Sequence, residues 1–445
     1  MRQTFIAMGI CCAIGISTLA CQDKSKDYTD PTLPVSERVS SLMSQMTLEE
    51  KVAQMCQYVG LEHMKKAEKD MSAEDLKHSH SQGFYPNLHS SDVEEMTKKG
   101  MIGSFLHVVK AEEANYLQSL AQQSRLKIPL LIGIDAIHGN GLYCGSTIYP
   151  TPIGQAATFD PALVERMSRE TAIEMRASGM HWTFTPNVEV ARDARWGRVG
   201  ETFGEDPYLT SEMVVPFIKA VQDGGVIATI KHFAANDQEF DRYTVSTEVS
   251  ERALQEIYLP PFKAAVQKAG VKAVMTGYNL VNGIHCTENK HLIDILKKDW
   301  GFKGMLMSDW ACTYSADNAA NYGLDLEMGS NDWFTRKELL PLIKEGKVTE
   351  EVINDKVRRI YGACISMGFF DRPQQDTHIP TFNPQANQMA LNAACEGIIL
   401  LKNEQNTLPI RQPKVIAVIG PTANPRRCCR ALPAKLSRFR RCTPH

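Results

Sequence analysis

Short apolar runs along this chain end in polar or charged residues, and helical patterns separate them. The clearest run is Met305–Met307, which follows a turn at Gly301–Gly304 and predicts a buried strand ending at Asp309 and Trp310. Five further runs predict strands within Pro129–Asp135, His181–Asn187, Val226–His232, Lys272–Asn279 and Gly323–Met328. Apolar periodicity predicts helices over Pro161–Gly179, Pro207–Gln222, Glu251–Lys268, Lys290–Lys298 and Thr349–Met367.

Alternating strands and helices with short connections indicate an α/β fold with a parallel sheet. Roughly 330 residues of this pattern fit an eight-stranded (β/α)8 barrel better than a small doubly wound sheet. In such barrels the chemistry lies at the carboxyl ends of the strands, where the polar residues of this chain fall. A carboxylate such as Asp309 at the end of a buried strand is costly unless it is paired or used. The neighbouring Trp310 can stack on a sugar ring and favours use; the alternative is that Asp309 caps a following helix.

The N-terminus has the pattern of an export signal. Arg2 precedes an apolar stretch from Phe5 to Ala20, and Ser17–Cys21 is similar to a bacterial lipoprotein cleavage box. We therefore expect residues 1–21 to be a lipoprotein signal peptide. The mature protein would be an exported bacterial lipoprotein of the periplasm or outer membrane, attached through a lipid on Cys21. In the alternative interpretation the chain is secreted and Cys21 is incidental.

Composition changes divide the remaining chain into segments. Residues 22–34 are predicted to be a linker, 35–370 the barrel, 371–389 an interdomain linker, and 390–424 the start of a truncated α/β/α sandwich domain. Within the barrel segment, Thr47 and Glu50 form a capping-box pattern that predicts an amphipathic helix running toward Gln57. In the last segment we expect a helix over Ala390–Asn403 and a parallel strand over Lys414–Gly420.

The charge pattern gives no overall case for binding nucleic acid. The 445 residues have a net charge of −2, but residues 425–445 hold seven Lys or Arg and no acid. Such a tail could bind nucleic acid or anionic lipid; the favoured interpretation is an aberrant, disordered tail without function. With 43% apolar residues the chain can form about two cores, so two domains are expected.

Neither the cysteines nor the histidines predict a metal site. Six of the twelve cysteines lie in the body of the chain, and they are scattered without metal-ligand spacing: Cys56, Cys144, Cys286, Cys312, Cys364 and Cys395. Some of these could pair after export. His78 and His80 form a His-x-His pattern in the polar segment His63–Ser91, which we interpret as a solvated insertion. No metal or other cofactor is expected.

Four motifs together resemble family 3 glycoside hydrolases, in the branch of two-domain, exo-acting β-glucosidases. They are RVSSLMSQMTLEEKVAQM, DARWGRVGETFGEDPYL, KHFAANDQEFDR and GFKGMLMSDW, in the order of the family, between about Glu37 and Gly420. The resemblance implies a (β/α)8 barrel followed by an α/β/α sandwich. It also implies retaining hydrolysis of terminal β-D-glucosyl residues from oligosaccharides or glucosides. A β-xylosidase-type specificity is the neighbouring alternative.

The resemblance assigns roles to residues of the predicted barrel mouth. Asp309 would be the nucleophile, kept anionic by nearby cations. Asp135 would accept hydrogen bonds from two sugar hydroxyls, and Trp310 would stack on the ring. The other implied substrate contacts are Arg198, Lys231, His232, Met275 and Tyr278.

Several of these residues have structural alternatives. Lys231 and His232 could belong to a structural charge network, and Met275 could be a core residue. We expect Arg195, rather than Arg198, to pair with Glu201, Glu205 or Asp206. Three residues of the following loop, Asp237, Glu239 and Arg242, are expected to order the loop behind the site.

The chain departs from the family at the proton donor. In two-domain members the donor is a Glu of the sandwich domain, and here only the start of that domain is recognised. Another branch uses a His in a Pro-Gly-His-Gly loop, where this chain has Ala234–Asp237. Losing a general acid costs about 10²–10⁴ in rate. We therefore expect an impaired glycosidase, or alternatively a non-catalytic or unstable sugar-binding fragment, with an apolar patch on the barrel face that would meet the sandwich. The oligomeric state is not predicted.

Overall fold

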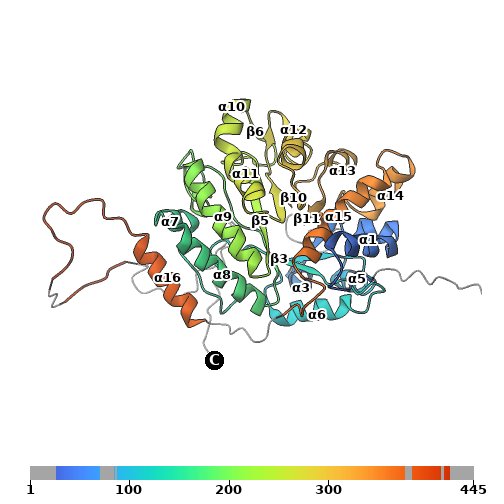
Figure 1. Cartoon of the computed structure of the whole chain (residues 1–445), viewed down its shortest axis with the longest axis horizontal. Coiled ribbons are helices and arrows are strands. Elements are labelled where there is room, and N and C mark those ends of the chain that lie inside the picture. Colours follow the sequence, from blue (N-terminus) through green and yellow to red (C-terminus); the bar gives the residue numbers. More distant parts are fainter. Residues whose placement is uncertain (1–26, 71–84, 86–87, 376–382, 412–414, 421–445) are drawn as a thin grey trace, which may run out of the picture.

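The centre of the molecule is a closed barrel of eight parallel strands. The computed structural model describes residues 27–70, 85, 88–375, 383–411 and 415–420. The strands follow one another around the barrel and the last pairs with the first, as Figure 1 shows with the surrounding helices. This confirms the predicted (β/α)8 barrel. The strands are β1 Cys56–Val59, β2 Ser104–Leu106, β3 Leu131–Ile134, β4 Trp182–Thr183, β5 Ile227–Phe233, β7 Ala273–Thr276, β10 Met305–Trp310 and β11 Leu326–Met328.

Helices cover the outside of the barrel, and a small sheet extends one side of it. The sheet joins β6 Ser246–Thr247, β8 Leu280–Val281 and β9 Ile284–His285. The helices are α1 Val35–Gln45, α2 Leu48–Ala53, α3 Leu61–Asp70, α5 Ser90–Lys98, α6 Ala111–Ala121, α7 Pro152–Ala156, α8 Pro161–Ala177, α9 Pro207–Asp223, α10 Glu251–Ala253, α11 Pro260–Gln267, α12 Lys290–Asp294, α13 Asp317–Tyr322, α14 Arg336–Lys344, α15 Glu350–Ser366 and α16 Pro384–Glu396, with a 3-10 turn η2 Val199–Glu201.

Two of the predicted helices, α8 and α9, begin where the sequence places them. Asp160 accepts a hydrogen bond from the backbone N–H of Ala162 at the start of α8, and Pro161 occupies the first helical position. Asp206 and Pro207 do the same for α9. An aspartate cap followed by proline satisfies the free N–H groups and fixes φ in the helical range. The bounds of α8 and α9 confirm the predictions to within two residues.

Two predicted helices are interrupted by π-helical segments. The predicted helix Glu251–Lys268 consists of α10, the π-helical η3 Leu254–Tyr258, and α11. The predicted helix Lys290–Lys298 consists of α12 and the π-helical η4 Ile295–Asp299. In the first case Pro260 starts a new helix, because its ring suits a first helical position and its missing N–H excludes an interior one.

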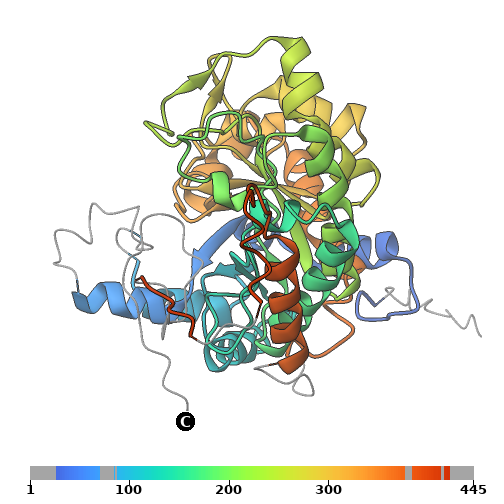
Figure 2. The same cartoon turned by 90° about the vertical axis from the view of Figure 1, so that its left-hand side faces the viewer.

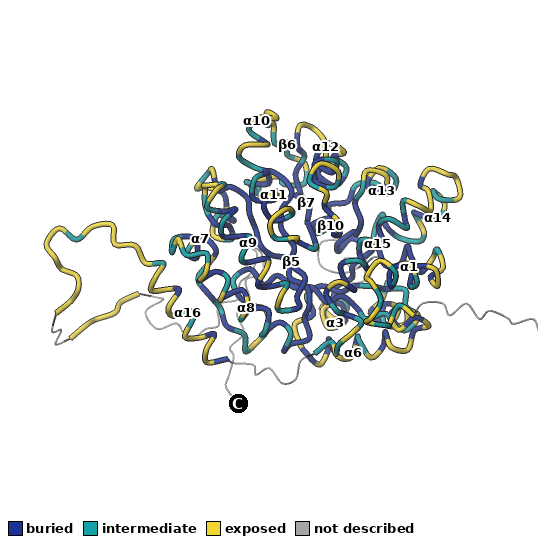
Figure 3. The backbone as a smooth tube through the Cα atoms, in the orientation of Figure 1, coloured by how far each residue is buried: buried dark blue, intermediate teal, exposed yellow. Residues whose placement is uncertain are grey.

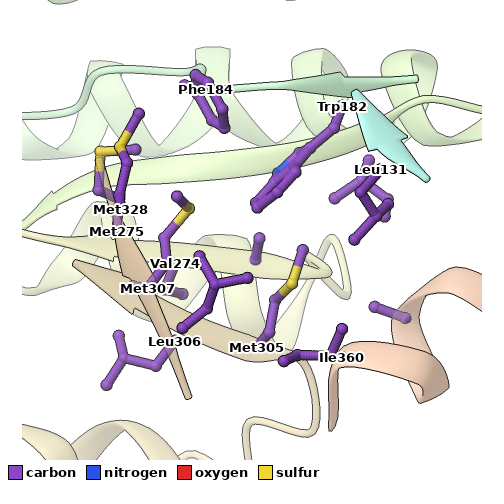
Figure 4. Close-up of a cluster of buried hydrophobic side chains, with 14 of the residues drawn as sticks. Leu131, Trp182, Phe184, Val274, Met275, Met305, Leu306, Met307, Met328 and Ile360 are labelled. Atoms are coloured by element: carbon purple, nitrogen blue, oxygen red, sulfur yellow. The ribbon is translucent and has the colours of Figure 1, made fainter. Parts of the chain in front are cut away.

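Large apolar side chains fill the barrel below its mouth. Figure 4 shows Trp182 and Phe184 facing Met275, Met307 and Met328 across the barrel. The indole N–H of Trp182 donates to Thr229 Oγ1 at 2.7 Å, so its polar atom is satisfied in the interior. The barrel is therefore a packed core, and its polar chemistry is confined to the end where the strands finish.

The predicted helix after Thr47 is shorter than expected. Thr47 and Glu50 form the capping box, but α2 ends at Ala53, and Gln57 lies in strand β1 rather than in a helix. The prediction was wrong at this end because Gln57 is buried in the barrel, where pairing with β2 and β11 outweighs helical periodicity.

The C-terminal elements differ most from the predictions. The expected helix Ala390–Asn403 starts earlier, because Asn383 caps α16 and Pro384 opens it, and it stops at Glu396 before Gly397. Figure 2 shows α16 lying along α8, which it contacts. The described part of the expected strand Lys414–Gly420, residues 415–420, pairs with no other described segment and is not a strand. A strand needs a neighbour for its backbone hydrogen bonds, and none of the described segments supplies one.

Several sequence-based expectations fall outside the described residues. These are the signal peptide with Cys21, the His-x-His pair His78 and His80, and the tail 425–445. Of the segment His63–Ser91, His63 lies in α3 and Ser90 in α5, while Tyr85 is buried, so this segment is not entirely solvated. In the part of the chain that the structure describes, no helix is long and apolar enough to cross a membrane. Cys56, Cys286, Cys312, Cys364 and Cys395 are free thiols.

Candidate active site

Three strands bring charged side chains together at the carboxyl end of the barrel. Asp135 directly follows β3, Lys231 and His232 lie on β5, and Asp309 lies on β10. Arg198 joins them from the loop that leads into η2. All five side chains are buried, so their charges must be compensated within the group.

Asp309 is held as an anion by its surroundings. Its Oδ1 accepts the backbone N–H of Trp310 at 2.6 Å, and its Oδ2 lies 3.1 Å from Nε2 of His232. Burial alone would raise the pKa of this carboxyl, but the hydrogen bond from His232 and the charges of His232, Lys231 and Arg198 lower it to about 2. The helix-cap alternative is wrong: β10 continues through Trp310, and the next helix starts only at Asp317.

A second carboxylate, Asp135, is paired on both oxygens. Its Oδ1 accepts from Nζ of Lys231 at 2.6 Å, and its Oδ2 lies 3.1 Å from Nε2 of His107. Burial opposes the charge of Asp135, but Lys231 and His107 hold the pKa of this carboxyl well below its usual range. Asp135 is therefore anionic, and it shares the cation Lys231 with the group that contains Asp309.

His107 was missed by the sequence analysis. It directly follows β2 and has a positive φ of 54°, a conformation that histidine adopts more readily than most residues. Its ring lies nearly parallel to that of Trp310, with centroids 6.4 Å apart and planes at 16°. The available signal was its position after the apolar run ending at Leu106, which is the same signal that identified the other strand ends.

Arg198, rather than Arg195, pairs with an acid of the following turn. Arg198 pairs with Glu201, with 2.8 Å between Nη2 and Oε2, and its Nη1 lies 3.4 Å from Nε2 of His232. Arg195 pairs with its near neighbour Asp193 and has a side chain that is 90% exposed. The prediction that Arg195 rather than Arg198 pairs with Glu201 was wrong. Arg195 lies in an exposed turn, whereas Arg198 directly precedes η2, the short helix that contains Glu201.

Glu239 and Arg242, from the loop that follows β5, contact residues of the site. Glu239 accepts from the indole N–H of Trp196 at 3.0 Å and from Nη1 of Arg242 at 2.8 Å. The Arg242 guanidinium lies 3.7 Å above the ring of Tyr278, and that ring lies 6.4 Å from the ring of His232. These contacts fit the expectation that Glu239 and Arg242 order the loop.

Met275 lies in the barrel core rather than at its mouth. It belongs to β7, is almost completely buried, and points into the cluster of apolar side chains drawn in Figure 4. Tyr278, three residues later in the same segment, lies beside His232 instead. Of these two implied substrate contacts, Tyr278 is therefore in the charged group and Met275 is a core residue, as the structural alternative expected.

Glu189 is the second residue that the sequence analysis missed. It lies after β4, between the buried residues Val188 and Val190, and its carboxylate pairs with Nδ1 of His232. Its Oε1 also accepts the backbone N–H of His232 at 3.1 Å. Glu189 lies two residues beyond the predicted strand run His181–Asn187, and an acid after an apolar run is the signal that identified Asp309.

Comparison with known proteins gives consistent matches over the barrel. Residues 47–363 match the glycosyl hydrolase family 3 N terminal domain. A β-glucosidase of Rhizobium radiobacter is 40% identical over 304 residues, which are 67% of this chain and 37% of the relative. β-Glucosidase B of Emericella nidulans is 38% identical over 278 residues, 61% of this chain and 33% of the relative. The chain thus spans little more than a third of the length of these curated relatives.

Solved structures agree with these matches. The β-glucosidase from Listeria innocua in complex with glucose superposes with a TM-score of 0.73 at 32% identity, over 84% of this chain and 53% of that chain. An exo-1,3/1,4-β-glucanase from a Pseudoalteromonas species gives a TM-score of 0.72 at 29% identity, over 85% of this chain and 49% of that chain.

Proposed function

This chain belongs to glycosyl hydrolase family 3, and from that premise we propose that it acts on terminal β-D-glucosyl residues by the retaining mechanism, with Asp309 as nucleophile. The observation that carries the proposal is the 3.1 Å contact between Asp309 and His232 at the carboxyl end of β10. A nucleophilic carboxylate has to be anionic, and the cations around Asp309 lower its pKa to about 2. The glucosyl specificity is supported by the β-glucosidases among its relatives, one of which was solved with glucose.

The proposed reaction begins with the Asp309 carboxylate. One carboxylate oxygen attacks the anomeric carbon, a glycosyl–aspartate ester forms, and the bond to the leaving oxygen breaks with its electron pair. Water then cleaves the ester and releases the sugar with its original β configuration. We assign no proton donor to the leaving oxygen. A substrate whose leaving group departs without a proton therefore tests the role of Asp309 as nucleophile directly.

We propose that the remaining charged residues bind the sugar. Asp135 accepts hydrogen bonds from sugar hydroxyls, since its carboxylate is anionic and lies in the same group as Asp309. The other proposed contacts, in keeping with their positions at the barrel mouth, are Arg198, Lys231, His232, Tyr278 and Trp310. Met275 supports them from the core.

The test uses the full chain and 2,4-dinitrophenyl β-D-glucoside, whose leaving group needs no protonation. We expect a burst of dinitrophenolate equal to one equivalent of protein, and Asp309→Ala should abolish it. The xylose analogue, measured in parallel, tests the alternative specificity. Binding of glucose without a burst would leave a sugar-binding protein, and a burst that survives Asp309→Ala would contradict the assignment of the nucleophile.

Attachment of the protein to a membrane is a separate proposal. The N-terminal pattern predicts a lipid on Cys21 and hence a place in the periplasm or outer membrane. Metabolic labelling with a radioactive fatty acid should label the wild-type chain and leave Cys21→Ala unlabelled.

A further inference from the structure

Glu189 is a buried carboxylate beside the proposed nucleophile that does not itself reach Asp309. It is 4% exposed, and the valines on either side of it are buried as well. Its Oε1 accepts the backbone N–H of His232 at 3.1 Å and pairs with Nδ1 of the same residue. Its Oε2 has no hydrogen-bond partner among the described residues. A buried carboxylate is costly unless it is compensated, and the direct contacts of Glu189 are with His232, while its charge also acts on Arg198.

His232 lies between two carboxylates. Nδ1 contacts Glu189, and Nε2 lies 3.1 Å from Oδ2 of Asp309. A neutral imidazole has one N–H and could donate to only one of them, whereas the imidazolium donates to both. The geometry therefore suits a ring that carries two protons.

The other groups around His232 act against that charge. Nη1 of Arg198 lies 3.4 Å from Nε2, Lys231 is the preceding residue on β5, and the ring of Tyr278 lies 6.4 Å away. Burial also disfavours the imidazolium, but the charge of Glu189, together with Asp309, outweighs burial and Arg198 and raises the pKa of His232 above its ordinary value. Of the groups that favour the charged ring of His232, Glu189 has the largest effect, through its charge.

We propose that Glu189 is a positioning residue: its charge keeps His232 doubly protonated, and its two contacts fix the ring so that Nε2–H points at Asp309. The part that concerns catalysis rests on the proposed role of Asp309 as nucleophile. The part that concerns His232 rests only on the contacts. Removing the charge of Glu189 would leave burial and Arg198 dominant, so His232 would lose its second proton and the donor to Asp309 would no longer be fixed.

The first test measures the protonation of His232 without any substrate. In protein labelled with ¹⁵N-histidine, both ring nitrogens of His232 should have the chemical shifts of an imidazolium at pH 7, with the signals assigned by their loss in His232→Gln. Glu189→Gln keeps an accepting oxygen and the side-chain size but removes the charge. We expect it to lower the pH at which His232 titrates by about one to three units. Glu189→Asp keeps the charge, so His232 should titrate at a pH close to the wild-type value in that variant.

Glu113→Gln is the matched control. Glu113 is another buried carboxylate whose Oε1 accepts a backbone N–H, that of Glu62 at 2.9 Å, but it lies on α6 and has no contact with His232. It should leave the His232 titration unchanged. A neutral His232 at pH 7 in the wild-type protein would overturn the proposal. So would a Glu189→Gln variant whose melting temperature falls while the pH at which His232 titrates stays unchanged. The wild-type measurement decides even where a variant does not fold.

The second test links His232 to Asp309. The reagent 2,4-dinitrophenyl 2-deoxy-2-fluoro-β-D-glucoside should label Asp309, and its rate constant should fall at high pH as His232 loses its proton. In Glu189→Gln the labelling rate constant should fall at lower pH than in the wild type. The difference in pH should equal the difference between the two NMR titration midpoints of His232. The reagent concentration that gives half-maximal labelling rate should change little. An NMR shift without any labelling of Asp309 would support the Glu189–His232 contact and overturn the proposed function. An unshifted pH profile together with a shifted titration would overturn the positioning role.

Discussion

At the scale of single residues, the two carboxylates at the barrel mouth differ in their hydrogen-bond partners. Asp135 is bound directly by Lys231 and His107, so both of its oxygens already have donors. One oxygen of Asp309 accepts a backbone N–H, and the other contacts His232. The backbone N–H of His232 in turn donates to Glu189. The ammonium of Lys231 acts on Asp309 only through its charge. In the proposed function the first carboxylate binds the sugar and the second is the nucleophile.

The ionisation of Asp309 contributes to stability with a definite pH dependence. Its pKa falls from 3.8 to about 2 on folding, so this contribution is present above pH 4 and is lost as the pH falls through the folded value. The shift corresponds to about 2 kcal/mol in the free energy of unfolding. Asp309→Asn has no charge to lose, so its stability relative to the wild type should rise by about that amount between pH 5 and pH 2. Urea unfolding of both proteins at several pH values measures this, and parallel curves would contradict it.

At the scale of elements, apolar runs and caps predicted most of the barrel. The strands from β3 to β11 that form the barrel fall within the predicted runs to within one residue at their ends, because a buried parallel strand is apolar along most of its length. The helices α8, α9 and α15 begin at recognisable caps. Strand β1 was missed because Gln57 breaks its apolar run, and its burial depends on partners from β2 and β11 that are distant in sequence.

The candidate site was predictable where a polar residue ends an apolar strand. That rule, together with the family resemblance, located Asp135, Lys231, His232 and Asp309. It did not reveal which side chains contact one another. Glu189 and His107 were missed because their importance lies in contacts with His232 and Asp135, which only the closed barrel creates. The wrong ion-pair prediction for Arg195 and Arg198 has the same origin, since both lie close in sequence to the same acids.

The capping box of α2 gives a test at this scale. Thr47 accepts the backbone N–H of Glu50 at 3.1 Å, and the Glu50 side chain accepts that of Thr47 at 2.8 Å. Thr47→Ala removes one of these bonds and should lower the free energy of unfolding by about 1 kcal/mol. Ser40→Ala, an exposed change within α1, should lower it much less. Chemical denaturation of the two variants compares them directly, and equal effects would show that the cap does not stabilise α2.

At the scale of the whole molecule, exposed apolar side chains gather in one place. Residues 398–401 and 415–419 extend away from the barrel in Figure 3, and most of their large apolar side chains are exposed. Helix α16, by contrast, packs on α8 and α7.

These exposed residues should govern self-association rather than folding. Leu401 and Ile419 are 92% and 91% exposed, so replacing both with lysine removes no packed contact and should leave the melting temperature within about 1–2 °C. Light scattering during storage at high protein concentration should nevertheless fall severalfold, since contiguous exposed apolar surface promotes aggregation. Gln405→Lys, an exposed change in the same segment, adds a charge without removing an apolar side chain and separates the two effects. If Gln405→Lys suppresses scattering as strongly as the double variant, net charge rather than apolar exposure is responsible.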